Sequence, residues 1–143
     1  MRLTVYSDYA LRVLMYLAIN RETLSTIQEI ADHYGISKNH LMKVTYELGL
    51  AGYIDTVRGR GGGVRLAQSP DQIGIGDVIR LTEEDFRLVE CFDPDTNQCV
   101  ISGRCKLARI LDEALNSYLK TLDRYTLADL AAERGLKRRL MAV

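Results

Sequence analysis

The sequence contains no tryptophan, and only two prolines, two histidines and three cysteines among its 143 residues. Little proline and 47% hydrophobic residues argue against a disordered chain. Three cysteines are too few for a disulfide scaffold, and an odd number cannot all pair internally. The chain is long enough to bury a core of its own, and we expect one domain with an appendage.

Long apolar runs are absent as well. No stretch approaches the roughly 18 residues of a membrane span, so we expect no membrane partner. The segment MRLTVYSDYALR carries Arg2, Asp8 and Arg12 and lacks the apolar core of a signal peptide. A reducing cytoplasm is therefore the expected location, where cysteines are thiols or metal ligands rather than cystines.

The formal net charge is zero, but the charges are unevenly distributed. Residues 58–65 hold three arginines and no acid, whereas residues 83–95 hold six acids and one arginine. The neutral sum therefore contains a basic patch and an acidic segment. A solvated surface could produce the same asymmetry.

Two helices are predicted near the N-terminus. Residues 8–20 are apolar on most sides, which is typical of a helix buried against more than one neighbour. Ser25 is the expected N-cap of a second helix that runs through Tyr34, with Gln28 in the capping-box position. Gly35 should end this helix.

The segment IQEIADHYGISKNHLMKVTYEL fits a helix-turn-helix. Ser37 should cap a third helix that runs to about Leu48 and is ended by Gly49 and Gly52. Small Ala31 lies where the two helices must approach, and glycine suits a positive φ at the turn. A generic helical hairpin is the alternative. The expected core positions of this unit are Ile30, Tyr34, Ile36, Leu41 and Val44.

A β-hairpin is predicted directly after the third helix. Residues 54–57 and 64–66 read as short strands, and the glycine-rich tip between them carries Arg58 and Arg60. This arrangement indicates the wing of a winged helix. A phosphate-binding glycine loop would need a helix to begin just beyond it, whereas the residues that follow alternate like a strand.

Residues 77–81 should form a short helix, and residues 106–122 the longest amphipathic one. A helix of about 18 residues spans roughly 27 Å, which is too long for so small a domain to cover. We expect it to pair with its copy in a two-fold homodimer; packing onto its own domain is the alternative. Its apolar positions are Leu107, Ile110, Leu111, Ala114, Leu115, Tyr118, Leu119 and Leu122.

The predicted fold is mainly α with a small β-hairpin. Residues 1–68 should form a winged helix-turn-helix DNA-binding domain. Residues 69–104 should form a linker helix and a cysteine loop, and residues 105–143 a dimerisation helix and a C-terminal tail.

All three cysteines, Cys91, Cys99 and Cys105, lie in one short polar segment. Zinc is poorly supported, because zinc sites use close cysteine pairs and four ligands, and His33 and His40 belong to the helix-turn-helix. A thiol–disulfide switch, three inert thiols and an iron–sulfur cluster, which thiolates hold, remain as interpretations.

In this order, MRLTVYSDYALR, GISKNHLMKV, RGRGGGVRL and the clustered cysteines resemble the winged-helix iron–sulfur regulators of the NsrR and IscR type. The resemblance runs over nearly the whole chain, up to YTLADL. It implies a DNA-binding transcriptional repressor, not an enzyme, whose iron–sulfur cluster senses nitric oxide and whose nitrosylation relieves repression. It also implies Cys91, Cys99 and Cys105 as ligands, with a 4Fe–4S cluster favoured over 2Fe–2S.

The fourth ligand of the iron–sulfur cluster distinguishes NsrR-type from IscR-type regulators. IscR-like members place a histidine three residues after the last cysteine, where this chain has Ala108. NsrR-like members use an aspartate near the N-terminus of the partner subunit, and Asp8 occupies that place. The alternative for Asp8 is an exposed ion pair with Arg12, four residues on. The gap from Cys91 to Cys99 is long for the family, which leaves the roles of Asp93 and Asp95 open.

DNA contacts are expected from two elements. Arg60 at the wing tip should enter or flank a minor groove, and Arg58 should also contact the DNA. A two-fold dimer implies an inverted-repeat operator in double-stranded DNA. A thiol-redox or iron–sulfur-status regulator on the same fold is the alternative function. The residues expected at the major groove, on the first turns of the third helix, are Ser37, Lys38, Asn39, His40 and Lys43.

Overall fold

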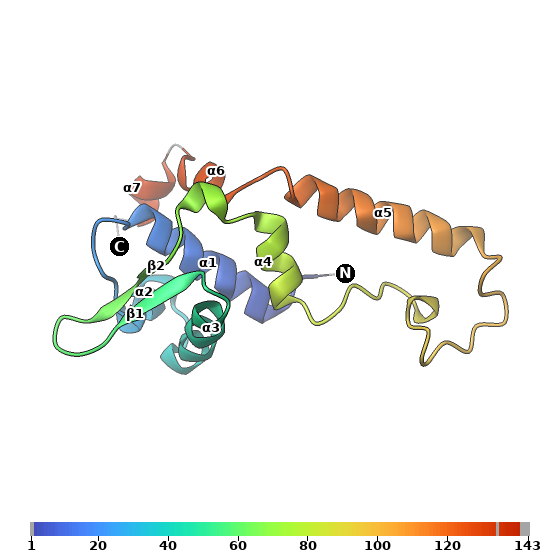
Figure 1. The fold of residues 1–143 in the computed structure, drawn as a ribbon, viewed down its shortest axis with the longest axis horizontal. Helices are drawn as coiled ribbons and strands as arrows, with labels where there is room; N and C mark the ends of the chain where they lie inside the picture. The colour runs from blue at the N-terminus through green and yellow to red at the C-terminus, as the bar shows by residue number, and fades with distance from the viewer. Residues whose placement is uncertain (1, 134, 141–143) are drawn as a thin grey trace.

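The chain folds into a winged helix-turn-helix body from which one long helix projects (Figure 1). The computed structural model describes residues 2–133 and 135–140. In chain order the elements are α1 (Val5–Ile19), α2 (Ile27–Tyr34), α3 (Lys38–Leu50), β1 (Ile54–Val57), β2 (Gly63–Leu66), η1 (Pro70–Gln72), α4 (Ile75–Thr82), η2 (Glu90–Phe92), α5 (Lys106–Leu122), α6 (Leu127–Ala131) and α7 (Leu136–Leu140).

The helix α1 is the centre of the core. Val13, Leu14 and Leu17 are at most 2% exposed, and the helix packs against α3, α4 and α6. It begins three residues earlier than the predicted Asp8, because Thr4 caps it by accepting a hydrogen bond from the Ser7 amide at 3.1 Å. The predicted multi-sided burial of this helix is confirmed.

The predicted cap of α2 was wrong by one residue. Thr26 is the N-cap: its hydroxyl accepts from the Glu29 amide at 3.1 Å, and the Glu29 carboxylate accepts from the Thr26 amide at 2.6 Å. Ser25 is not available as a cap because its backbone pairs with Val64 at the wing. Gly35 ends α2 with a φ of 62°, as predicted.

The helix α3 starts after Ser37, as predicted, but the Ser37 side chain makes no capping hydrogen bond, and the helix runs to Leu50 rather than Leu48. Gly49 lies inside the helix, and Gly52, with a φ of 79°, turns the chain toward β1. The predicted core of the helix-turn-helix is confirmed, with Ile30, Ile36, Leu41 and Val44 buried and Tyr34 packed against them.

The wing is a two-stranded antiparallel hairpin with Ile54 opposite Leu66 and Val57 opposite Gly63. Ile54 and Val64 point into the core, which fixes the wing against the helices. Gly62 is needed at the turn, because a Cβ there would collide with the Val57 carbonyl.

The helix α4 extends beyond the predicted residues 77–81 at both ends, whereas α5 has the predicted bounds. All of α5 lies in the described part of the chain, and none of its side chains is buried. The helix projects from the body rather than folding back over it (Figure 1), and its C-terminal part contacts the body through α4 and through Leu122, which packs against the core. No helix among residues 2–133 and 135–140 has the length and apolarity to cross a bilayer.

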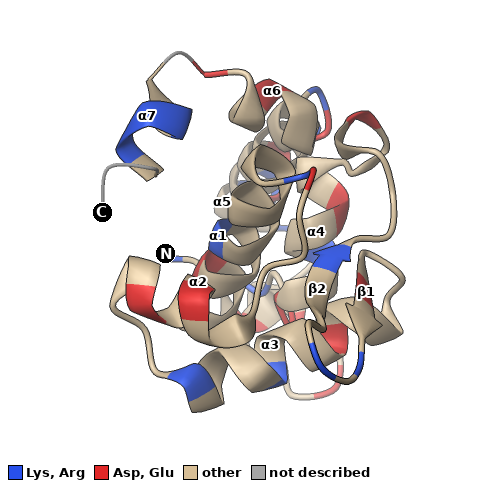
Figure 2. Ribbon diagram, turned by 90° about the vertical axis from the view of Figure 1, so that its left-hand side faces the viewer, with Lys and Arg blue, Asp and Glu red and all other residues tan. Residues whose placement is uncertain are grey.

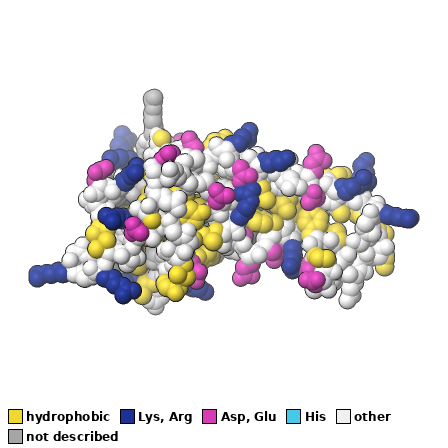
Figure 3. Space-filling view, in the orientation of Figure 1, with side chains coloured by type: hydrophobic (Ala, Val, Ile, Leu, Met, Phe, Trp, Pro, Cys, Tyr) yellow, Lys and Arg dark blue, Asp and Glu magenta, His cyan; other side chains and the backbone are white. Residues whose placement is uncertain are grey.

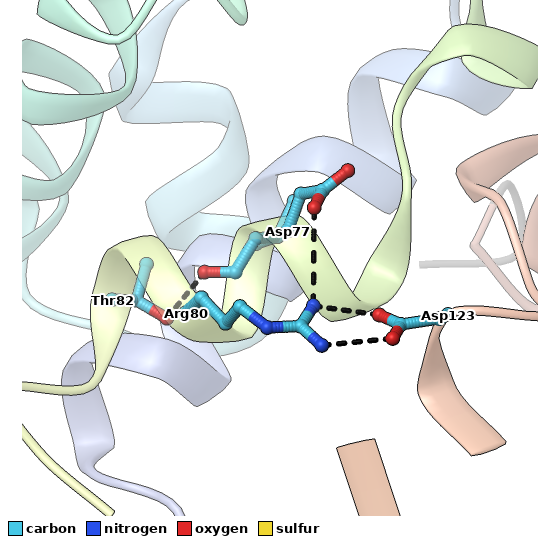
Figure 4. Close-up of polar contacts among 5 residues, drawn as sticks. Asp77, Arg80, Thr82 and Asp123 are labelled. Atoms are coloured by element: carbon cyan, nitrogen blue, oxygen red, sulfur yellow. Dashed lines mark hydrogen bonds and ion pairs between the residues drawn. The ribbon is translucent and has the colours of Figure 1, made fainter. Parts of the chain in front are cut away.

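One end of α5 is tied to α4. Arg80 donates two hydrogen bonds to the Asp123 carboxylate, at 2.6 and 2.8 Å (Figure 4). Next to this pair the Ile75 amide donates to the Tyr125 carbonyl at 3.0 Å. The far end of α5, which follows the cysteine segment, lies away from the body (Figure 1).

Candidate functional site

The predicted recognition residues form an exposed face on the first turns of α3. Buried Leu41 and Val44 fix the opposite face of this helix against α1 and α2. A helix seated on its apolar face in this way presents its polar side chains outward in a fixed direction. All five predicted residues are exposed: Ser37, Lys38, Asn39, His40 and Lys43.

The wing adds cations to the same edge of the molecule. Arg58 and Arg60 are exposed at the hairpin tip, and Figure 2 shows basic segments on α3 and on the β1–β2 loop along one edge. Arg65 on β2 instead faces Asp55 across the hairpin at 3.9 Å. Arg58 and Arg60 are therefore the wing arginines that we expect to contact a ligand bound to α3.

Sequence reasoning missed two apolar residues on this face. Met42 is 50% exposed and Tyr46 is 64% exposed, four residues apart on the outer side of α3. Their spacing places them between the buried positions Leu41, Val44 and Leu48, and that pattern would have revealed them. Exposed apolar side chains next to cations suit a groove that offers both phosphates and thymine methyl groups.

The structure brings the three cysteines together. Cys91 lies in η2, Cys99 in the following loop and Cys105 directly before α5, and all three line one cavity of about 200 Å³. Each of them is a half-buried free thiol. The sequence around them is polar, but the cavity also has apolar walls. These are Val89, Ile101, Leu107, Ala108 and Leu111.

Asp93 organises the loop between Cys91 and Cys99. Its carboxylate accepts hydrogen bonds from the Thr96 hydroxyl at 2.8 Å, the Arg87 guanidinium at 2.6 Å and the Asp95 amide at 3.1 Å. The Thr96 hydrogen bond is the largest cause that lowers the pKa of Asp93. Asp93 therefore shapes the long loop from within, a role that sequence reasoning had left open.

The thiols suit a cluster better than a single ion. Among residues 2–133 and 135–140, no three His, Cys, Asp or Glu side chains converge closely enough to hold one metal ion. In a 4Fe–4S cluster each thiolate binds a different iron of a bulky core, so its ligands are spread around a cavity. Three thiols around one cavity with apolar walls fit that donor set.

Asp8 lies on the first turn of α1 and pairs with Arg12, at 2.8 Å between Oδ2 and Nη2. Figure 1 places α1 in the body and the cysteine loop at the far end of the α5 arm. Within one protomer the described structure thus groups the cysteines and leaves Asp8 apart from them. The predicted Asp8–Arg12 pair forms, and a ligand role for Asp8 requires a second subunit.

Sequence reasoning also missed Glu83, which follows α4. Its Oε1 accepts hydrogen bonds from the Thr4 amide at 2.8 Å, the Thr4 hydroxyl at 3.0 Å and the Ser7 hydroxyl. Burial raises the pKa of Glu83, but these hydrogen bonds outweigh burial and hold the pKa below its usual value. Because the partners are 76 and 79 residues apart, no local pattern indicates this contact.

The helix α5 exposes apolar side chains near its N-terminal end. Leu107 is 60% exposed and Ile110 is 51% exposed, whereas Leu115 and Tyr118 further along are half-buried and line a cavity with other segments of the same chain. Figure 3 shows hydrophobic side chains gathered along this arm. Such a surface is typical of a helix that pairs with another chain.

Known proteins of similar sequence and structure are transcriptional regulators. Residues 3–133 match the profile of the Rrf2 family, described as "Iron-dependent Transcriptional regulator". The HTH-type transcriptional regulator NsrR of Bacillus subtilis strain 168 is 57% identical over 135 residues, which cover 94% of this chain and 92% of that protein.

Two solved structures are similar over almost the full length. The IscR structure from T. potens is 25% identical with a TM-score of 0.76, covering 95% of this chain and 91% of that one. CymR, the global cysteine regulator of B. subtilis, is 26% identical with a TM-score of 0.74, covering 92% and 97%. Both similarities extend from the body along the α5 arm.

Proposed function

The chain belongs to the Rrf2 family of transcriptional regulators, and from this premise we propose that it is a cytoplasmic, homodimeric DNA-binding repressor whose iron–sulfur cluster senses nitric oxide. The observation that carries the proposal is the cysteine cavity: three thiols from separate points of the arm line a single pocket. The 57% identity to an HTH-type transcriptional regulator NsrR agrees with the resemblance to NsrR-type regulators, and that resemblance is the reason for proposing nitric oxide as the signal.

The residues divide the work between two regions. Cys91, Cys99 and Cys105 would hold the cluster, a 4Fe–4S cluster in preference to 2Fe–2S, and Asp8 of the partner subunit would supply the fourth ligand. When bound, the cluster supplies iron, a site at which nitric oxide can compete with protein ligands. A carboxylate is a hard ligand for soft thiolate-bound iron, so Asp8 is the ligand expected to leave first.

The DNA-binding face would read an inverted repeat. Ser37, Lys38, Asn39, His40 and Lys43 lie where a recognition helix meets the major groove. Arg58 and Arg60 would flank the minor groove, which is narrow and electronegative in A·T-rich DNA. Loss of the Asp8 link would free the two recognition helices to change their spacing, and repression would end.

An anaerobic titration tests the proposal. We expect the purified protein to contain iron and acid-labile sulfide, and nitric oxide to change its visible spectrum and release it from operator DNA in parallel. Cys91→Ser, Cys99→Ser and Cys105→Ser should each lose most of the iron and sulfide while staying folded, because the core lies in the body. Val100→Ala, at a side chain of the same loop that is 98% exposed, is the control.

Full iron and sulfide content in all three cysteine variants would exclude the cavity as the cluster site. A thiol-redox or iron–sulfur-status regulator is the second candidate, because cysteines that line one cavity could also form a disulfide. That candidate predicts DNA release by a thiol oxidant or by cluster loss, with no specific response to nitric oxide.

A further inference from the structure

Glu83 joins the segment that leads from α4 to the cysteines to the first turn of α1. The residue stands directly after α4, where the chain leaves the body toward the cysteine segment. Its carboxylate accepts from the Thr4 amide, the Thr4 hydroxyl and the Ser7 hydroxyl. Hydrogen bonds to an ionised acceptor are stronger than neutral ones, so three of them on one oxygen hold the two segments firmly together.

The donors of these bonds define the geometry of the first turn of α1. Thr4 is the N-cap of α1, and its hydroxyl also accepts from the Ser7 amide at 3.1 Å. Ser7 is 0% exposed and directly precedes Asp8. The Asp8 amide in turn donates to the Thr4 carbonyl at 3.1 Å. Any shift of Glu83 therefore acts on the turn from which Asp8 projects.

The same junction borders the recognition helix. Thr4 and Glu83 line a cavity of about 380 Å³ together with Lys43 and Glu47 of α3. Lys43 is one of the residues expected at the DNA. One place in the body thus brings together the residue after α4, the first turn of α1 and the middle of α3.

We propose that Glu83 is a positioning residue that clamps the first turn of α1 and so presents Asp8 to the cluster held by the partner subunit. This inference rests on the proposed function. The clamp fixes where α1 begins, and it ties that point to the segment that leads to the chain's own cysteines. Glu83 acts through Thr4 and Ser7 rather than by touching the cluster.

Three variants test the clamp. Glu83→Ala removes all three hydrogen bonds, Glu83→Gln keeps an acceptor oxygen without the charge, and Glu22→Ala makes the same charge change at an exposed residue between α1 and α2. The first readout is amide hydrogen exchange over residues 4–8 in the cluster-free full-length protein. The second is the anaerobic visible spectrum of the cluster-loaded protein, compared with that of Asp8→Ala.

Glu83→Ala should raise amide exchange over residues 4–8 by about tenfold, as expected when a hydrogen bond to a charged group is lost. Its cluster spectrum should move toward that of Asp8→Ala. Glu83→Gln should restore most of both properties, and Glu22→Ala should match the wild type.

The outcomes separate this inference from the function on which it rests. A wild-type protein that takes up no cluster overturns the proposed function, and with it the positioning role. If the wild type takes up the cluster, unchanged exchange in Glu83→Ala overturns the clamp alone. Faster exchange with a wild-type spectrum shows a purely structural contact and overturns the positioning role.

Discussion

Arg60 projects from the tip of a wing that the core holds in place. Its side chain is exposed, and the strands behind it are fixed by buried Ile54 and Val64. Because the hairpin is already rigid, little backbone entropy is lost when its cation binds a DNA phosphate or a narrow minor groove. Its contribution is therefore expected to appear in the salt dependence of DNA binding.

We predict that Arg60→Ala weakens operator binding and reduces the slope of log K against log salt by about one, as for the loss of one phosphate contact. Titrations of fluorescent operator DNA at several salt concentrations measure both quantities. Arg124→Ala, at the end of α5, is the control and should leave the slope unchanged. An unchanged slope in Arg60→Ala would remove the wing tip from the interface.

At the residue scale, the sequence predicts those helix ends that depend only on neighbouring residues. Gly35 was expected to end α2 because the left-handed conformation suits glycine, and it does so. The cap was placed at Ser25 rather than Thr26 because both residues can cap a helix. The choice depends on the pairing of Ser25 with Val64, which lies 39 residues away and has no local signature.

At the element scale, α5 was predicted with its observed bounds because its apolar residues repeat every three to four positions without interruption. How α5 is attached could not be predicted. The attachment depends on Gly76 of α4, since a Cβ at this position would collide with the Asp123 carboxylate that Arg80 holds. The sequence shows a glycine inside the helix at Gly76 but does not indicate that Asp123 packs against it.

The Arg80–Asp123 pair should make the attachment of α5 sensitive to acid. The hydrogen bonds from Arg80 hold the pKa of Asp123 below its ordinary value, which is about 3.9 in an unfolded chain. A lowered pKa in the folded state adds stability at a pH above about 3.9 and loses it as the pH falls through the folded value.

Asp123→Asn should therefore melt below the wild type at pH 7, and the difference in melting temperature should be smaller at about pH 3, below the unfolded pKa. Thermal unfolding followed by circular dichroism at both pH values measures it. Asp112→Asn, on the exposed side of the same helix, should show no such pH-dependent difference. A difference of equal size at both pH values would mean that the charge of Asp123 does not hold the helix.

At the scale of the whole molecule, the grouping of the cysteines follows from the sequence, but the place of Asp8 does not. The cysteines are close in the chain, and one loop with Asp93 inside it brings them to one cavity. Asp8 is in the body, on a helix that lies apart from the end of the arm (Figure 1). The proposed ligand role of Asp8 therefore requires a second copy of the chain, and the sequence pattern within one chain does not give the distance between residues of two copies.

A mixed dimer tests this arrangement directly. One subunit carries Asp8→Ala with its cysteines intact, and the other carries Cys99→Ser with Asp8 intact. If the fourth ligand crosses the dimer, the first subunit's cysteines and the second subunit's Asp8 form one complete site. If the ligand comes from the same chain, neither site is complete.

We predict that the mixed dimer, purified anaerobically through two different affinity tags, holds one cluster with the wild-type visible spectrum. The Asp8→Ala homodimer should keep a cluster on three thiolates with an altered spectrum, and the Cys99→Ser homodimer should hold little iron. Arg12→Ala in place of Asp8→Ala is the control, because loss of the Asp8–Arg12 ion pair alone should leave the spectrum of either dimer unchanged. A mixed dimer with the altered spectrum of the Asp8→Ala homodimer would contradict ligation across the subunits, since the only intact Asp8 would then have failed to reach the only intact cysteines.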